Sequence, residues 1–544
     1  MKDNYLYKHN PIVKRIFLSM LAPTILMNLT TAIGSVADTI IIGQYLDDLS
    51  LSVVTFATPI FMLINTFAAL FAVGGCITTS IDAGKGDKKS ANRAFSLSIE
   101  LLYFIGVLFY FAGAFFSNTI TGWLGASGEV FGLVEQYSRI ILIGGPVFVL
   151  NIGLAFFVRN DGRPTLSMVG MFSSIVVDII LNFVFVGYLD YGVSGAAYST
   201  VIGQIVSILI ICTHFFSSKN TLKFNFTLNK NIFRVIKNGV SSALNFVYQF
   251  LIILIMNHIL VKLAPENGVI IYTVVFNLST VSLSVFEGIS QTIQPMISTY
   301  FGERSFKNIK ATLRLAFITI FVICGSVTLL LEIFPQLVPI IFGIDDSLLV
   351  GKSAVAVRIF ATSMIIMTIN VVIGYYLQST EKTTLSAIFV SLRSFVLLLS
   401  ATIILGLAFG MNGIWASYTV AEVLAFIIIV SVLRAKKAKN NTETVENATY
   451  CLTFNCSDGS LEDFISYAET FIRENNFSNE VCDKVSLYFA SITEFYSAQK
   501  SKYIEIEMNT IDNKIIIRDN LKRTTISEDT PVLGWNRLCV KQGE

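Results

Sequence analysis

The sequence predicts an all-α polytopic membrane protein with twelve transmembrane helices in two six-helix lobes, followed by a small α+β domain. Three observations carry this prediction. Of the 544 residues, 53% are hydrophobic and only 14% are charged, and the mean hydropathy is +0.67, which is too apolar for a soluble protein. Apolar runs of about 20 residues, the length that a bilayer core requires, recur along most of the chain. After Asn440 these runs stop.

The predicted membrane spans are identified by length and apolar character, and each is separated from the next by a short polar loop. They begin near Ile16, Leu51, Ala94, Gln136, Leu166, Val193, Val235, Val269, Leu313, Ala354, Leu385 and Gly413, and the last ends before Arg434. The resulting division is residues 1–218 for the first lobe, 219–439 for the second lobe, 440–448 for a linker and 449–544 for the final domain.

The basic residues of the loops predict the orientation. Lys and Arg collect at both ends of the membrane part and in the loops after even-numbered spans, where we include Arg159 and Arg163. The opposite loops hold only Arg139, Lys262 and Lys352. By the positive-inside rule, both termini lie in the cytoplasm of a bacterial plasma membrane protein. The net charge of +2 without a basic cluster argues against a nucleic-acid partner.

An internal repeat is visible when residues about 218 positions apart are compared. Gly84 of AGKGD corresponds to Gly302 of FGERS, and Thr165-Leu166-Ser167 corresponds to Thr384-Leu385-Ser386. Gly192-x-x-Gly195 corresponds in the same way to Gly410-x-x-Gly413. Six spans per half is an even number, so both halves have the same orientation in the membrane. This is the parallel-repeat architecture of transporters with a central cavity between two lobes.

Polar side chains inside the spans are the candidate site. A carboxylate at membrane depth costs roughly 2.5 to 3.5 kcal/mol, so Asp38 in span one needs a partner, a cavity or an ion, unless it simply ends the helix at the outer surface. In span five, Asp178 and Asn182 are four residues apart and share one helical face. Thr200 of span six is a further oxygen ligand. This oxygen-only set suits a shared proton or a transient sodium ion, and no other metal is expected.

The depths of the two carboxylates do not match for straight helices. At 1.5 Å per residue, Asp178 lies roughly 20 Å above Leu166, whereas Asp38 lies about 30 Å above the start of its span. A tilt of span one, or a bend near Pro23, is therefore expected.

Several motifs together resemble the multidrug and toxic compound extrusion (MATE) family over about residues 10 to 435. They are Ala37-Asp38-Thr39-Ile40-Ile41-Ile42-Gly43, Gly84-Lys85-Gly86-Asp87, Val158-Arg159-Asn160-Asp161-Gly162-Arg163-Pro164, Gly192-Val193-Ser194-Gly195-Ala196-Ala197 and Gln294-Pro295-Met296-Ile297-Ser298 with Phe301-Gly302. The resemblance implies two six-helix lobes, V-shaped packing and cation-coupled export. Related MATE sequences usually carry Asn before Asp in span five, and here the order is reversed.

The second lobe lacks an acid at the positions that match Asp38 and Asp178. Branches of the family that use a carboxylate in spans seven and ten would find Gln249 and Asn370 near those places, which implies a coupling site in the first lobe, as in the DinF-like branch. Glu287 is the acid that we place well inside a span of the second lobe, where it would attract cationic substrate or serve a structural role. Together with Gln249 and Asn370 it is predicted to line the substrate cavity. Arg393 either reaches toward the polar end of its span or pairs with a carboxylate.

The segment after the linker alternates between helix and strand patterns. Residues 461–474 and 480–496 are predicted amphipathic helices, and residues 503–508 and 514–518 are predicted strands of a hairpin. The pattern resembles the GHKL-type ATPase fold of anti-sigma-factor kinases. That family requires Glu-x-x-x-Asn and Asp-x-Gly, but Ala498 follows Glu494 and Leu521 follows Asp519 at those spacings. We therefore expect a degenerate domain that is regulatory or binds a cytoplasmic protein partner, in place of nucleotide binding.

These features predict a transporter and not an enzyme, with no cofactor. The leading hypothesis is a monomeric antiporter that exports cationic or amphipathic drugs and toxic compounds against inward proton or sodium flow. A lipid-linked oligosaccharide flippase is the alternative, although such proteins usually have extra spans and basic cavities. A third hypothesis is a membrane sensor that signals through the final domain, which deletion of the tail would distinguish from a transporter.

Overall fold

The structure is a computed structural model of the chain. It describes residues 11–46, 48–218, 220–225, 232–263, 268–342, 344, 346–439, 450–455, 461–474, 477–499, 505–511, 514–519 and 536–541. In some helices, including the segments around residues 38 and 260, only the backbone is described.

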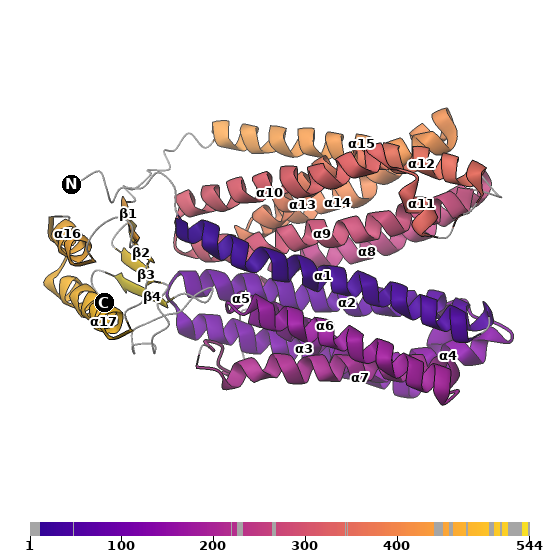
Figure 1. The fold of residues 1–544 in the computed structure, drawn as a ribbon, viewed down its shortest axis with the longest axis horizontal. Coiled ribbons are helices and arrows are strands. Elements are labelled where there is room, and N and C mark those ends of the chain that lie inside the picture. The colour runs from indigo at the N-terminus through magenta and orange to yellow at the C-terminus, as the bar shows by residue number, and fades with distance from the viewer. Residues whose placement is uncertain are drawn as a thin grey trace.

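Long helices form the body of the molecule and fall into two groups that lie side by side (Figure 1). The first lobe comprises α1 (Pro11–Tyr45), α2 (Asp48–Gly84), α3 (Lys88–Trp123), α4 (Val130–Ile143), α5 (Gly145–Asn160), α6 (Pro164–Asn182), η1 (Phe183–Tyr188), α7 (Gly192–Cys212) and η2 (Thr213–Phe216). The second lobe comprises α8 (Ile232–Leu263), α9 (Gly268–Gly302), α10 (Phe306–Ile333), α11 (Leu337–Ile341), α12 (Ser347–Ala361), α13 (Met364–Ser379), α14 (Thr383–Ser391), η3 (Leu392–Leu397) and α15 (Leu398–Lys439).

Among the described residues, nine helices are long and apolar enough to cross a membrane. The number is eleven if the bent pairs α4 with α5 (50°) and α12 with α13 (42°) each count as one span. This count does not reach the predicted twelve, because the last candidate, Thr383–Lys436, is a single stretch of 54 residues. That stretch includes a sharp break at Gly410, where φ is 60° and ψ is −140°.

The backbone conformation repeats at the offset of about 218 residues that the sequence shows. Left-handed residues recur in corresponding turns of the two lobes, at Gly86 and Arg304, at Gly162 and Glu381, and at Gly192 and Gly410. A side-chain contact recurs as well: Ser167 donates a hydrogen bond to Ala155 O at 2.9 Å, and Ser386 donates to Gly374 O at 3.0 Å. These pairs are 218 or 219 residues apart, which supports the predicted parallel repeat.

The first helix of each lobe begins by packing against the other lobe. The start of α1 contributes Ile12, Ile16 and Met20 to a hydrophobic core that otherwise belongs to the second lobe. The start of α8 packs against α2, where a Cβ added at Gly239 would lie only 1.8 Å from Leu70 O. The lobes are therefore interlocked at one end of the bundle, which we call the domain end because the C-terminal domain lies beside it (Figure 1).

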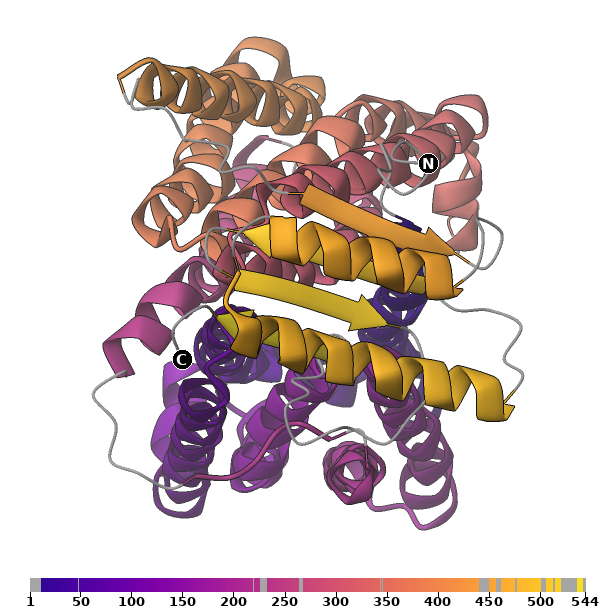
Figure 2. The same ribbon diagram turned by 90° about the vertical axis from the view of Figure 1, so that its left-hand side faces the viewer.

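In its described residues, the C-terminal domain has one antiparallel sheet and two helices. Strands β1 (Tyr450–Asn455), β2 (Glu505–Ile511), β3 (Lys514–Asp519) and β4 (Asn536–Lys541) pair in that order, and α16 (Leu461–Glu474) and α17 (Asn479–Gln499) pack on one face. The two predicted helices and the predicted hairpin are confirmed, while β1 and β4 were not predicted. The sheet lies between these two helices and the bundle (Figures 1 and 2).

Candidate functional site

A buried carboxylate and a buried amide meet in the first lobe, as the spacing of four predicted. Asp178 and Asn182 on α6 are 6% and 0% exposed, and Asn182 Nδ2 donates a hydrogen bond to Asp178 Oδ1 at 3.2 Å. The pair lies directly before the π-helical segment η1, and π-helical segments are frequent at functional sites. Because apolar helices surround the pair, an ionised Asp178 would gain from a bound cation.

Thr200 lies on α7, which packs closely against α6. Close approach is possible because of Gly203, where an added Cβ would lie 2.5 Å from Ser174 O and 3.4 Å from Asp178 Cβ. Thr200 is one turn before Gly203, and its hydroxyl donates to Ala196 O at 2.9 Å. Its oxygen lone pairs remain usable as acceptors, so it keeps the ligand chemistry expected of it.

The Asp38 side chain lies outside the described residues, but its backbone is part of α1. One turn earlier, a Cβ at Gly34 would lie 2.8 Å from Ile175 Cδ1 on α6. Helices α1 and α6 both start at the domain end and run in the same direction (Figure 1). Along this direction, Asp38 lies four residues beyond Gly34, and Asp178 lies three residues beyond Ile175. The backbone therefore brings the two aspartates to a similar depth, and the tilt of span one or bend near Pro23 expected from the sequence stays a prediction.

Two further polar groups of the first lobe were missed from the sequence. Asn151 on α5 is fully buried and donates a hydrogen bond to Gln204 Oε1 on α7 at 2.5 Å. Its amide nitrogen also lies 3.5 Å from Met171 Sδ on α6. Asn151 could have been identified from the sequence, because it is a single amide within the apolar run Val149 to Phe157. Asp38 was identified in the same way, as a single polar residue in an apolar span.

The second lobe contains a buried network around Glu422 of α15, which was also missed. Asn370 of α13 donates to Glu422 Oε2 at 2.7 Å and to the Glu422 carbonyl at 2.8 Å. Arg393 of η3 pairs with Glu422 Oε1 at 3.4 Å, and its charge also acts on Glu287 of α9. The interpretation of Arg393 as a carboxylate partner is therefore the correct one of the two. Among the described residues, Arg393 is paired with Glu422 alone and acts on Glu287 only through its charge, so this interior has an acidic excess when both carboxylates are ionised.

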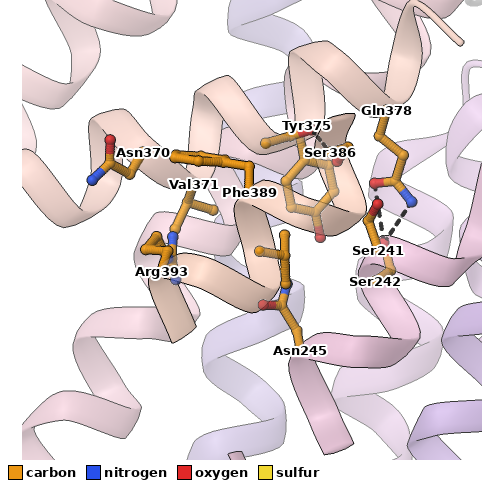
Figure 3. A pocket seen from close by; sticks show the side chains of 12 residues that line it. Ser241, Ser242, Asn245, Asn370, Val371, Tyr375, Gln378, Ser386, Phe389 and Arg393 are labelled. Atoms are coloured by element: carbon orange, nitrogen blue, oxygen red, sulfur yellow. Dashed lines mark hydrogen bonds between the residues drawn. The ribbon is translucent and has the colours of Figure 1, made fainter. Parts of the chain in front are cut away.

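A small cavity of about 20 Å³ lies beside this network, large enough for about one water molecule. Asn370 and Arg393 lie on one side of it, and Ser241, Ser242 and Gln378 lie on the other side (Figure 3). Of the three residues predicted for a substrate cavity, Asn370 lines this space, whereas Glu287 and Gln249 are not part of its lining. Gln249 is half-buried on α8, one turn beyond the lining residue Asn245.

Charged groups join the two lobes at the domain end. Arg234 of α8 binds both oxygens of Asp82 of α2 at 2.9 Å each, and its Nε donates to Glu381 Oε1 at 2.8 Å. Deeper in the interface, Asn238 of α8 donates to Thr78 Oγ1 of α2 at 3.0 Å. We call these contacts, from Asp82–Arg234 to Thr78–Asn238, the inter-lobe latch.

Arg159 was counted as a loop charge, and this assignment is wrong. It lies in the last turn of α5, is fully buried, and donates to Gln291 Oε1 at 2.7 Å and to Gln294 Oε1 at 3.2 Å on α9. Gln291 also exchanges two hydrogen bonds with Asn28 of α1 at 3.2 Å each. Arg159 thus helps to hold the lobes together.

Within the described part of the chain, no group of three or more His, Cys, Asp or Glu could hold a metal ion.

Comparisons with known proteins agree with this architecture. The MatE family model matches residues 23–184 and again 239–404, once in each lobe. Multidrug export protein MepA of Staphylococcus saprophyticus is 25% identical over 458 residues, which are 82% of this chain and all of that protein. MepA of Staphylococcus aureus strain MRSA252 is 24% identical with the same coverage.

Solved structures show the same fold. A multidrug resistance MATE transporter of the MOP superfamily in an outward-facing conformation has a TM-score of 0.74 at 21% identity, covering 79% of this chain and 97% of that one. The MATE multidrug transporter DinF-BH has a TM-score of 0.71 at 23% identity, covering 78% and 96%. Because the family model covers more than half of the 544 residues, this chain belongs to the MatE family of MATE transporters.

Proposed function

We propose that this protein is a cation-coupled antiporter that exports cationic or amphipathic compounds across a bacterial plasma membrane. The observation that carries the proposal is the buried Asp178–Asn182 pair, a carboxylate and an amide in contact at 3.2 Å inside the first lobe. Relatives aligned over their whole length carry the name multidrug export protein, which supports drugs and toxic compounds as the class of substrate.

The proposed topology has twelve spans with both termini in the cytoplasm. It is obtained when each bent pair counts as one span and the last stretch is divided at Gly410. The domain end is then the cytoplasmic side, where the basic loops gather. The contacts of the inter-lobe latch and of Arg159 close this side, so the arrangement corresponds to a transporter with its cytoplasmic entrance shut.

The coupling step uses Asp178, Asn182 and Thr200, with Asp38 at the same depth on α1. A proton or sodium ion entering from outside neutralises the carboxylates, whose charges repel each other in a medium of low dielectric constant. Neutralisation favours the arrangement of α1 and α6 that binds substrate weakly, because a ligand shifts an equilibrium only by its differential affinity. Release of substrate outside then accompanies cation entry.

Cationic substrates are favoured by the acidic excess of the second lobe. Two carboxylates, Glu287 and Glu422, stand against the single guanidinium charge of Arg393, so a positively charged compound that reaches this interior is attracted when both carboxylates are ionised. This distribution supports drug export over the flippase alternative, for which basic cavities are typical.

Transport by the purified protein in liposomes tests the proposal. A fluorescent lipophilic cation is followed while a proton gradient and a sodium gradient are imposed separately. The expected result is transport against the concentration gradient with at least one of the two cations, and none without either. Equal transport in the presence and absence of both gradients would refute cation coupling.

A further inference from the structure

The sheet of the C-terminal domain has a second face that its own helices do not cover. Ile515, Ile517 and Leu538 face α16 and α17 and form the core of the domain. Arg518 of β3 and Arg537 of β4 lie on the opposite face, because side chains alternate along a strand. They are direct partners in the antiparallel ladder. They are 2% and 0% exposed, so the bundle covers them.

Two arginines side by side on a sheet are unfavourable unless an anion lies between them. Glu303, the residue that follows α9, supplies this anion. It is 3% exposed, pairs with Arg518 through its Oε2, and its Oε1 lies 3.2 Å from Arg537 Nε. The Arg518 guanidinium also lies 5.1 Å from the centre of the Tyr300 ring, at cation–π distance. The domain is thus bound to the second lobe.

The first lobe is held by the same arginine. Arg537 donates hydrogen bonds to the carbonyl oxygens of Ala83 at 2.6 Å and Gly84 at 2.7 Å. These carbonyls belong to the last turn of α2, the end of the helix that carries partial negative charge, and Ala83 O also accepts a hydrogen bond from Gly86 N at 3.0 Å. One guanidinium therefore bridges α2 of the first lobe and α9 of the second.

The two bridged helix ends touch only while the lobes are closed at this end. A Cβ at Gly84 would lie 2.3 Å from Thr299 O, and one at Gly302 would lie 2.1 Å from Ile81 O, so α2 and α9 are in backbone contact. Asp82 of the inter-lobe latch directly precedes the carbonyls that Arg537 binds. Separation of the lobes at the domain end would remove α2 or α9 from reach of Arg537.

We propose that the C-terminal domain is an autoinhibitory clamp that binds the closed domain end through Arg518 and Arg537 and holds back its opening. A domain that binds the closed form more tightly than the open form shifts the equilibrium toward closure, and closure strengthens its binding in return. The partner of this domain is then the transporter itself. The clamp rests on the proposed alternation of the two lobes, but not on the identity of the substrate or the coupling ion.

A buried position between the lobes reports the opening directly. Thr78 is fully buried against α8, so the variant Thr78→Cys reacts with a water-soluble maleimide only when the lobes part. The rate of maleimide labelling is measured on the full-length protein in nanodiscs. The labelling rate of the protein that keeps Thr78 is subtracted, because it reports the reaction of the native cysteines. No substrate or gradient is used, so the result does not depend on transport.

In this background, the double variant Arg518→Ala with Arg537→Ala should react about fivefold faster or more, the range of typical coupling between sites. Glu303→Gln leaves the domain unaltered and keeps the size of the side chain, and it should have the same effect. Arg473→Ala removes an exposed arginine of α16 and serves as the matched control, which should react at the unaltered rate. Equal rates in all of these proteins would overturn the clamp, and so would acceleration by the control alone.

Discussion

Asp178 is the residue on which the proposed cation coupling depends. Its position could be predicted from the sequence, because a carboxylate and an amide four residues apart in an apolar run must share a helical face. Its partner Asn182 is confirmed by a hydrogen bond of 3.2 Å. The side-chain geometry of Asp38 lies outside the described residues, so its participation stays a prediction.

The variant Asp178→Asn should abolish gradient-driven export while leaving the protein folded, because the change removes charge and proton uptake but keeps the size. Export is measured in liposomes with an imposed gradient. Glu129→Gln, which removes an exposed carboxylate just before α4, is the control and should export normally. Normal export by Asp178→Asn would exclude this residue from coupling.

Glu422 shows what single-sequence reasoning overlooks at the residue scale. It stands in the final span without another charged or amide residue at helical spacing, and its partners Asn370 and Arg393 come from segments at least 29 residues away. Only packing brings these groups together. Arg159 was misassigned for the same reason, because a basic residue near a helix end resembles a loop charge until its partners across the interface are known.

Removing the charge of Glu422 should destabilise the protein. The variant Glu422→Gln leaves Arg393 with Glu287 alone, and loss of one member of a buried ion pair costs about 3 kcal/mol. The thermal midpoint in detergent should therefore fall by several degrees. Glu480→Gln, which breaks the exposed pair with Lys484 on α17, should change stability by less than about 1 kcal/mol. Similar midpoints for both variants would contradict the importance of the buried network.

At the scale of elements, the packing of α2 against α8 decides how the lobes meet. A Cβ at Gly74 would lie 2.1 Å from Val235 O, and one at Gly239 would lie 1.8 Å from Leu70 O. Both distances are far below van der Waals contact, so the closed arrangement needs glycine at both positions. The two helices must separate if either residue acquires a side chain.

The variant Gly239→Ala should weaken the closed arrangement. In the Thr78→Cys background, it should make the reaction of the introduced thiol with maleimide faster. Gly325→Ala is the matched control, because a Cβ at Gly325 of α10 meets nothing within 4 Å. That change should leave the rate unaltered and should raise helix stability slightly. Equal rates in the two variants would show that close packing of α2 and α8 does not control opening.

The long helices could be predicted from the sequence because apolar length is a strong local signal. Each of the twelve predicted starts falls inside a described helix. The boundary predicted between the spans that begin near Leu385 and Gly413 coincides with the break at Gly410. Strands β1 and β4 were missed because each is separated in sequence from the predicted hairpin.

At the scale of the whole molecule, the repeat makes two similar lobes, and a few polar contacts at the domain end decide whether they stay closed. The repeat could be predicted from glycines and turn residues in register. The contacts of the inter-lobe latch and of the clamp could not, because they join residues more than 130 positions apart.

Competition between cation and substrate tests the central claim, that the first-lobe carboxylates couple cation entry to export. The measurement is the affinity of purified protein for a fluorescent cationic substrate, taken as a function of pH and of sodium concentration. Affinity of the unaltered protein should fall as proton or sodium concentration rises, since the bound cation favours the arrangement that binds substrate weakly. Asp178→Asn and Asp38→Asn should each flatten this dependence. An affinity that is independent of both cations, or a dependence unchanged in the two variants, would contradict the account.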